Sequence, residues 1–174
     1  MASQKFVEQL NAQIGHEFSA HQQYVACAVY FDAKTMPRMA AFFYRQALEE
    51  RDHAMMMVQY LIDANADVEI PGAESPTNTF ENIVAPVRLA LDQENRVATQ
   101  INDLTALARA ENDYASDQFM QWFIKEQVEE VATMSDLLTV VIRAEHDVEA
   151  IEEYVARELG DVGDDSTAPA VAGS

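Results

Sequence analysis

The chain has 174 residues, of which 49% are hydrophobic, and this is enough for one domain with a full core. Its 30 acidic and 11 basic residues give a formal net charge of −19, which argues against nucleic acid and anionic membranes as partners and suits the collection of cations. No apolar run approaches the roughly 20 residues of a membrane span, and no signal-peptide stretch follows the first residues. A single cysteine, Cys27, excludes an internal disulfide, so we expect a cytoplasmic location.

Four long stretches repeat their apolar residues with a helical period. Only 5 glycines and 5 prolines occur in the chain, and three of the glycines lie beyond residue 159, so long uninterrupted helices are expected. The predicted helices run from about Ser3 to Ala33, from Pro37 to about Asn65, from near Asn82 to near Ala110, and from just after Asp113 to about Ala144. A shorter amphipathic piece covers residues 148–159.

The connections between these helices predict the topology. Residues 66–81 contain Pro71-Gly72 and Ser75-Pro76, as a linker does, and 16 extended residues reach roughly 50 Å, which exceeds the length of a helix in this chain. The turns near residues 35 and 112 are short, as antiparallel neighbours require. We therefore predict an all-α fold, a four-helix bundle with one long crossover plus a short C-terminal fifth helix, over residues 1–159. Residues 160–174 are predicted to be a disordered acidic tail.

Each predicted helix carries a charged side chain in the middle of an otherwise apolar seam, where unpaired carboxylates are costly. Counted from the turn centres near residues 35 and 112, these side chains lie 15 or 18 residues away. Because hairpin partners at equal distance from a turn lie at the same height, all of them fall in one layer near the middle of the bundle. The layer comprises Glu17, Glu50, His53, Glu94, Gln127 and Glu130.

This predicted layer points to bound metal. Four carboxylates in a dry core would carry a charge of about −4, which requires protonation or cations. Two divalent metals supply that charge, and oxygen ligands with one imidazole suit Fe(II), Mn(II) or Zn(II). Carboxylate-rich sites in helical bundles are di-iron or di-manganese sites. Glu50, between the two hairpins, is the carboxylate that we expect to bridge the metals.

With these residues in this order, the chain resembles a prokaryotic non-haem ferritin from residue 5 to about residue 158. The motifs that carry the resemblance are the pair Glu17 and Tyr24, the run Glu49-Glu50-Arg51-Asp52-His53, Glu94, and the run Glu126-Gln127-Val128-Glu129-Glu130. The resemblance implies that Glu17, Glu50 and His53 hold one iron. It implies a second iron on Glu50, Glu94 and Glu130, with Gln127 beside them and Tyr24 as a neighbouring phenol. Glu49, Glu126 and Glu129 match an additional iron site.

The resemblance also implies an activity and an assembly. Members of this family oxidise Fe(II) with O2 or H2O2 as ferroxidases and store ferric oxyhydroxide mineral inside a hollow shell of 24 chains. Bacterioferritins carry a haem-ligating Met directly after the glutamate of the second helix, and a second Glu-x-x-His motif on the fourth. Here Arg51 and Glu130 occupy those positions, so we predict no haem.

Several alternatives stay open at this point. A rubrerythrin-like di-iron peroxidase or oxidase without a cage is the main one, although the second Glu-x-x-His motif and rubredoxin-type cysteines are absent from the sequence. A metal-free interaction module would leave the buried acids unexplained. His21 is either a hydrogen-bonded core histidine or a support for the metal site, and Trp122 either packs against a neighbouring chain or lies near the metals.

Overall fold

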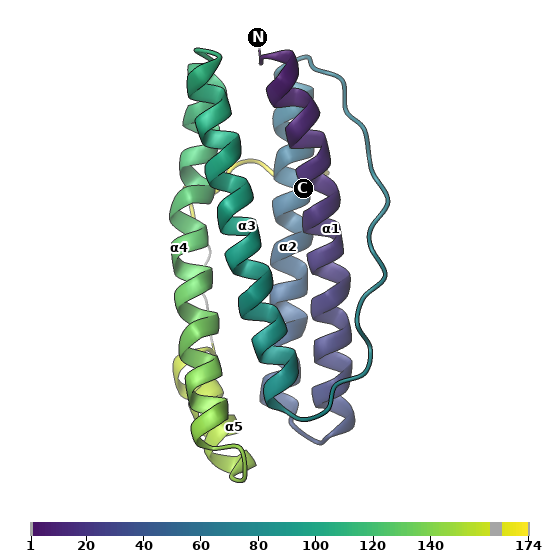
Figure 1. Ribbon diagram of the computed structural model, residues 1–174, viewed down its shortest axis with the longest axis vertical. Coiled ribbons are helices and arrows are strands. Elements are labelled where there is room, and N and C mark those ends of the chain that lie inside the picture. Colours follow the sequence, from purple (N-terminus) through teal and green to yellow (C-terminus); the bar gives the residue numbers. More distant parts are fainter. Residues whose placement is uncertain (1, 161–164, 174) are drawn as a thin grey trace.

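The computed structural model describes residues 2–160 and 165–173 and confirms the all-α four-helix bundle with a short fifth helix (Figure 1). The predicted helix ends lie within two residues of the observed ones. None of the helices described is long and apolar enough to cross a membrane. The helices are α1 (Gln4–Ala33), α2 (Pro37–Asp63), α3 (Val84–Ala110), α4 (Tyr114–Arg143) and α5 (Val148–Glu158).

Two of the long helices, α1 and α4, begin at a residue whose side chain caps the first turn. The Ser3 hydroxyl accepts a hydrogen bond from the backbone N–H of Phe6 (3.3 Å), and the Asp113 carboxylate accepts one from Ser116 (3.2 Å). Pro37 opens α2, where a missing N–H leaves no hydrogen bond unmade. These starts set the register of each helix and thus the face that each mid-helix acid presents to the core.

The crossover between α2 and α3, residues 64–83, runs along the outer side of α1 from one end of the bundle to the other (Figure 1). The side chain of Gln23 holds it, since its Oε1 accepts from the backbone N–H of Thr77 (2.8 Å) and its Nε2 donates to the carbonyl of the same residue (3.0 Å). A Cβ on Gly15 would lie 2.7 Å from the ring of Pro71, so only glycine allows this close approach.

The core consists of two apolar clusters, one toward each end of the bundle. Phe31, Phe43 and Leu137 belong to the cluster near α5, while Phe6 and Leu61 belong to the other. On each long helix the buried side chains of the predicted layer lie between the residues of one cluster and those of the other. The two clusters thus give this layer an apolar support on either side.

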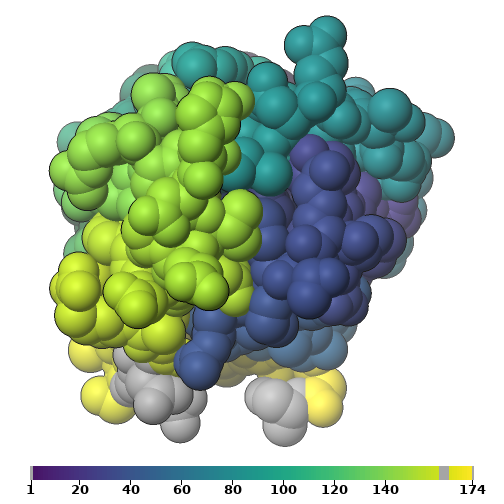
Figure 2. Space-filling model, turned by 90° about the horizontal axis from the view of Figure 1, so that it is seen from below, coloured from purple at the N-terminus to yellow at the C-terminus, as the bar shows by residue number. Residues whose placement is uncertain are grey.

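The α5 helix closes one end of the bundle. Its Glu152 carboxylate accepts hydrogen bonds from the backbone N–H groups of Arg38 (2.8 Å) and Met39 (2.9 Å), so it caps the first turn of α2. Figure 2, which views this end, shows the α4–α5 segment lying beside the turn between α1 and α2.

The C-terminal segment 165–173 lies against the bundle. Asp165 accepts a hydrogen bond from Trp122 Nε1 on α4 (3.0 Å), and the backbone N–H of Ala172 donates to the carbonyl of Met55 on α2 (3.2 Å). Of the predicted disordered tail, residues 161–164 lie outside the described residues, whereas 165–173 follow a defined path from α4 to α2. The domain boundary after residue 159 stays a prediction.

Candidate metal centre

The four long helices each contribute to the predicted site. α1 supplies Glu17 and Tyr24, α2 supplies Glu49, Glu50 and His53, α3 supplies Glu94, and α4 supplies Glu126, Gln127, Glu129 and Glu130. The six groups of the predicted layer are all buried, as is Tyr24. Glu49 and Glu126 are half-buried and Glu129 is exposed.

Glu17, Glu50 and His53 converge at the middle of the bundle, where one ligand atom from each lies within 4.8 Å of the others. His53 Nδ1 is 3.6 Å from Glu50 Oε2. Glu50 Oε2 and Glu17 Oε2 are buried with no hydrogen-bond partner among the described residues. Two unpaired carboxylate oxygens beside an imidazole are costly in a dry core unless a cation or a proton neutralises them. The donor set therefore fits a divalent metal ion.

Protein donors, by contrast, hold Glu94 and Glu130. Tyr24 donates its hydroxyl hydrogen to Glu94 Oε1, and Gln127 Nε2 donates to Glu94 Oε2 (2.6 Å). Glu130 Oε1 accepts from Gln46 Nε2 (3.2 Å). Within residues 2–160 and 165–173, Glu17, Glu50 and His53 are the one set of three ligands spaced closely enough for a shared ion. The predicted second metal site, on Glu50, Glu94 and Glu130, stays a prediction.

Three carboxyl groups of the site, those of Glu50, Glu94 and Glu130, have a raised pKa when no metal is bound. Burial raises the pKa of Glu50 well above its usual value, and the nearby charges of Glu94 and Glu17 raise it further. Burial likewise raises the pKa of Glu94 and that of Glu130. Cations that enter this layer replace protons on these carboxyl groups, so metal binding and proton release are coupled.

Tyr24 is a stable hydrogen-bond donor at this site. Burial raises the pKa of its phenol well above the ordinary value, and the charge of Glu94 adds to the shift. The ring packs against Phe43, with 5.7 Å between the ring centroids. Tyr24 therefore stays protonated at neutral pH and fixes one oxygen of Glu94.

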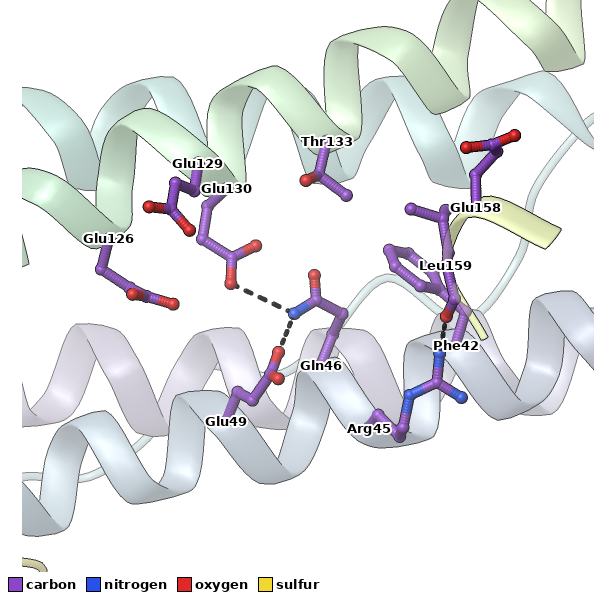
Figure 3. A pocket seen from close by; sticks show the side chains of 10 residues that line it. All are labelled: Phe42, Arg45, Gln46, Glu49, Glu126, Glu129, Glu130, Thr133, Glu158 and Leu159. Atoms are coloured by element: carbon purple, nitrogen blue, oxygen red, sulfur yellow. Dashed lines mark hydrogen bonds between the residues drawn. The ribbon is translucent and has the colours of Figure 1, made fainter. Parts of the chain in front are cut away.

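A second group of acids borders this layer on the side between α2 and α4. Glu49 from α2 and Glu126, Glu129 and Glu130 from α4 line a cavity of about 190 Å³ and point toward one another (Figure 3). Gln46 Nε2 donates to both Glu49 and Glu130, and so joins the two groups of acids (Figure 3). The structure thus brings the residues of the predicted additional site into one cavity that adjoins the buried layer.

The structure also places the two residues for which the sequence left alternatives. The indole of Trp122 packs edge-on against the His53 ring, with 5.6 Å between centroids, so it lies beside the candidate centre in its own chain. His21 Nδ1 donates to the backbone carbonyl of Ala47 (2.6 Å) and thus joins α1 to α2 as a hydrogen-bonded histidine.

Two glutamines at the site were not singled out from the sequence. Gln13 Nε2 donates to Glu17 Oε1 (2.8 Å), and Gln46 makes the contacts with Glu49 and Glu130 described above. Each precedes a predicted ligand, Glu17 or Glu50, by four residues, which is the helical spacing at which side chains meet. That spacing could have identified both glutamines from the sequence as neighbours of the predicted ligands.

Comparisons with known proteins agree with this geometry. The sequence profile of the ferritin-like domain matches residues 7–144. Ferritin BfrB of Mycolicibacterium smegmatis is 51% identical over 169 residues, which are 97% of this chain and 93% of that protein. The bacterial non-heme ferritin of Staphylococcus aureus is 35% identical over 160 residues, covering 92% of this chain and 96% of that one.

The solved structures give the same result. An open pore ferritin from the archaeon Archaeoglobus fulgidus superimposes with a TM-score of 0.87 at 29% identity, covering 94% of this chain and 100% of that one. The bundle, its buried acids and these relatives agree, and the chain belongs to the ferritin family.

Proposed function

We propose that this protein is a ferroxidase and an iron store, which oxidises Fe(II) to Fe(III) at the mid-bundle centre and keeps the ferric product inside a shell of identical chains. The observation that carries the proposal is the buried set of Glu17, Glu50 and His53, in which two carboxylate oxygens have no hydrogen-bond partner among the residues that the structure describes. A ferritin-family bundle that only needed stability would fill this layer with apolar side chains.

In this proposal Glu17, Glu50 and His53 bind one Fe(II), and Glu50, Glu94 and Glu130 bind a second, with Gln127 beside them. The two substrate ions share Glu50. The charges of Glu94, Glu17 and Glu130 all raise the pKa of its carboxyl group. Binding of the ions displaces the protons that burial favours on the carboxyl groups of Glu50, Glu94 and Glu130. The resulting carboxylates are hard anionic ligands, which stabilise Fe(III) more than Fe(II) and so favour oxidation.

The chemistry balances with either oxidant. Each of two Fe(II) ions loses one electron, and O2 takes up both electrons and two protons to give H2O2. With H2O2 as the oxidant, two electrons and two protons give two molecules of water. Holding both iron ions in one centre lets the oxidant receive its two electrons together, so that no one-electron oxygen product is released.

The acids around the adjoining cavity serve, in this proposal, as an additional iron site on the way out of the centre. Glu49, Glu126 and Glu129 face that cavity, and Gln46 spans from Glu49 to Glu130 (Figure 3). In this proposal an oxidised ion passes from Glu130 to these more exposed carboxylates and stays among oxygen ligands throughout. The proposal includes no haem, because Arg51 follows Glu50.

The proposed shell has 24 chains, the number that the family resemblance implies. Exposed apolar side chains on α1 and α2, among them Val29, Leu48 and Ile62, support an assembly in which neighbouring chains cover them. The free and buried Cys27 suits the reducing cytoplasm.

Aerobic loading with a few hundred Fe(II) per shell, followed by size-exclusion chromatography that tracks iron and protein together, tests the proposal. With 19.5 kDa per chain, a shell elutes near a mass of about 470 kDa and carries the iron with it. A small oligomer that holds only two or three irons per chain would contradict storage and indicate a di-iron peroxidase or oxidase without a cage.

A further inference from the structure

The two carboxylate oxygens of Glu17 have different surroundings. Oε1 accepts a hydrogen bond from Gln13 Nε2 (2.8 Å), whereas Oε2 is buried with no partner among the described residues. One oxygen is therefore held by the protein, and the other is left for a cation. This asymmetry contrasts with Glu94, both of whose oxygens accept hydrogen bonds from Tyr24 or Gln127.

Gln13 is itself held in place from two further sides. Its side chain is buried, at 2% exposure, one turn before Glu17 on α1. Its Nε2 also donates to Gln100 Oε1 on α3 (3.2 Å), and its Oε1 lies 3.2 Å from His16 Nδ1. All three polar contacts of the amide are made by neighbours on α1 or α3.

These contacts allow only one orientation of the amide. A carboxylate oxygen only accepts hydrogen bonds, so the nitrogen of Gln13, not its oxygen, must face Glu17. The oxygen of Gln13 then accepts a hydrogen bond from His16 Nδ1, which requires the tautomer that carries the hydrogen on Nδ1. If the Gln13 amide were flipped by 180°, its oxygen would face the acceptor oxygens of Glu17 and Gln100 in place of the nitrogen.

We propose that Gln13 is a positioning residue of the ferroxidase centre, which fixes Glu17 as a ligand through one oxygen only. A carboxylate binds a metal through one oxygen or through two. With Oε1 engaged by Gln13, Oε2 is the Glu17 oxygen left to bind the ion beside Glu50 and His53, so a coordination position stays open for the oxidant. Gln13 also removes the cost of orienting the free carboxylate each time Fe(II) enters.

This inference rests on the proposed function, because it assigns Gln13 a role in binding the substrate ion. The test is anaerobic Fe(II) titration calorimetry on the assembled protein, together with the dependence of the initial oxidation rate on Fe(II) concentration. Three variants are compared with the wild type: Gln13→Met, Gln23→Met and Glu17→Ala. Gln23 is the matched control, since it is a buried glutamine of the same helix that binds the crossover and not the centre.

For Gln13→Met we expect Fe(II) affinity to fall by about 10-fold to 100-fold, the usual effect of losing a partner of a metal ligand. The Fe(II) concentration for half-maximal rate rises in step, while the rate at saturating Fe(II) changes far less. Gln23→Met is expected to bind Fe(II) as the wild type does. Gln13→Asn, one methylene too short to reach Glu17, tests the same contact with a polar side chain retained and is expected to weaken binding as well.

The outcomes separate the two proposals. If Glu17→Ala binds Fe(II) as tightly as the wild type, the assignment of the ferroxidase centre fails. If Glu17→Ala loses a bound ion but Gln13→Met and Gln13→Asn bind like the control, the positioning role alone is wrong. Equal losses of affinity in Gln13→Met and Gln23→Met, with equal losses of thermal stability, would show a merely structural role and would also overturn it.

Discussion

The phenol of Tyr24 on α1 donates a hydrogen bond to Glu94 Oε1 on α3, and this contact joins the two helical hairpins at the level of the metal centre. It is one of two donors that hold the Glu94 carboxylate, the other being Gln127. In the proposed centre, Glu94 would keep its position before the ion arrives because the protein holds both of its oxygens, as preorganised sites require.

Tyr24→Phe is expected to slow the initial oxidation of Fe(II) by about tenfold, because Glu94 loses one of its two donors while the ring is retained. Stopped-flow absorbance after mixing with two Fe(II) per chain measures the effect. Tyr30→Phe is the matched control, since the Tyr30 hydroxyl is buried without a hydrogen-bond partner among the described residues and its removal should not affect the rate. An unchanged rate in Tyr24→Phe would show that Gln127 alone positions Glu94.

Glu130→Gln is expected to stabilise the iron-free protein at neutral pH by about 1–3 kcal/mol, because each unit by which the folded-state pKa is raised is equivalent to about 1.4 kcal/mol. Burial, followed by the charges of Glu94 and Glu49, raises the pKa of Glu130 well above the ordinary 4.5. The folded chain thus binds the proton more tightly than the unfolded chain does. The free energy of unfolding then falls as pH rises from the unfolded-state pKa through the folded-state one. Glutamine avoids this loss and still accepts a hydrogen bond from Gln46.

Thermal unfolding of iron-free samples at about pH 5 and about pH 8 checks whether the stability of the wild type falls relative to the variant as pH rises. The advantage of Glu130→Gln over the wild type should be small at the lower pH and larger at the higher one. Glu129→Gln changes the exposed neighbouring position and serves as the control. A gain that is the same at both pH values would refute the electrostatic explanation. The same substitution should weaken Fe(II) binding, so that stability and function are opposed at this position.

The double variant Glu49→Gln/Glu126→Gln separates the centre from the cavity beside it. Neither residue belongs to the set of Glu17, Glu50 and His53, so the first two Fe(II) per chain should be oxidised at the wild-type rate. Later additions should be oxidised more slowly if, as proposed, oxidised iron leaves the centre through these carboxylates. Successive additions of two Fe(II) per chain, followed by absorbance, measure the difference.

Glu153→Gln, on the exposed face of α5, is the control for the change in charge. If the double variant slowed the first addition as much as the later ones, the cavity acids would be part of the centre itself. If no addition were slowed, the exit route would lie elsewhere.

The layer of buried acids could be predicted because helices have a fixed rise per residue. Glu17 and His53 are equally far from one turn, and Glu94 and Glu130 from the other, so antiparallel packing brings them to one height. The crossover was evident from its prolines and its length. These features depend on chain geometry, which spacing alone encodes.

What the sequence could not reveal was the pairing of individual atoms. Gln13 and Gln46 have the right spacing to meet a glutamate on their own helix, yet Gln46 reaches Glu49 and Glu130 rather than Glu50. Side-chain rotamers and the neighbouring helix decide between such partners. The path of residues 165–173 was equally hidden, because it depends on contacts between residues far apart in the sequence, such as Asp165 with Trp122 and Ala172 with Met55.

Asp165→Ala is expected to release the C-terminal segment from the bundle. The hydroxyl and backbone N–H of Thr167 hold the pKa of Asp165 well below its usual value, and Trp122 and Lys125 lower it further. A lowered pKa means that the carboxylate contacts persist at neutral pH and are lost only as pH falls through the folded-state value. The chain contains one tryptophan, so its fluorescence reports on the surroundings of Trp122, to which Asp165 belongs.

The emission of Trp122 should shift to longer wavelength in Asp165→Ala, and limited proteolysis should remove the C-terminus faster than in the wild type. Asp136→Ala, an exposed acid further along α4, is the control for charge and should change neither. Trp122 also packs against His53, so the same variant shows whether the segment affects the centre. A wild-type rate of Fe(II) oxidation together with shifted emission would mean that the indole stays against His53 without Asp165. Unshifted emission, in contrast, would mean that Ala172 and the apolar contacts of the segment hold it without the carboxylate.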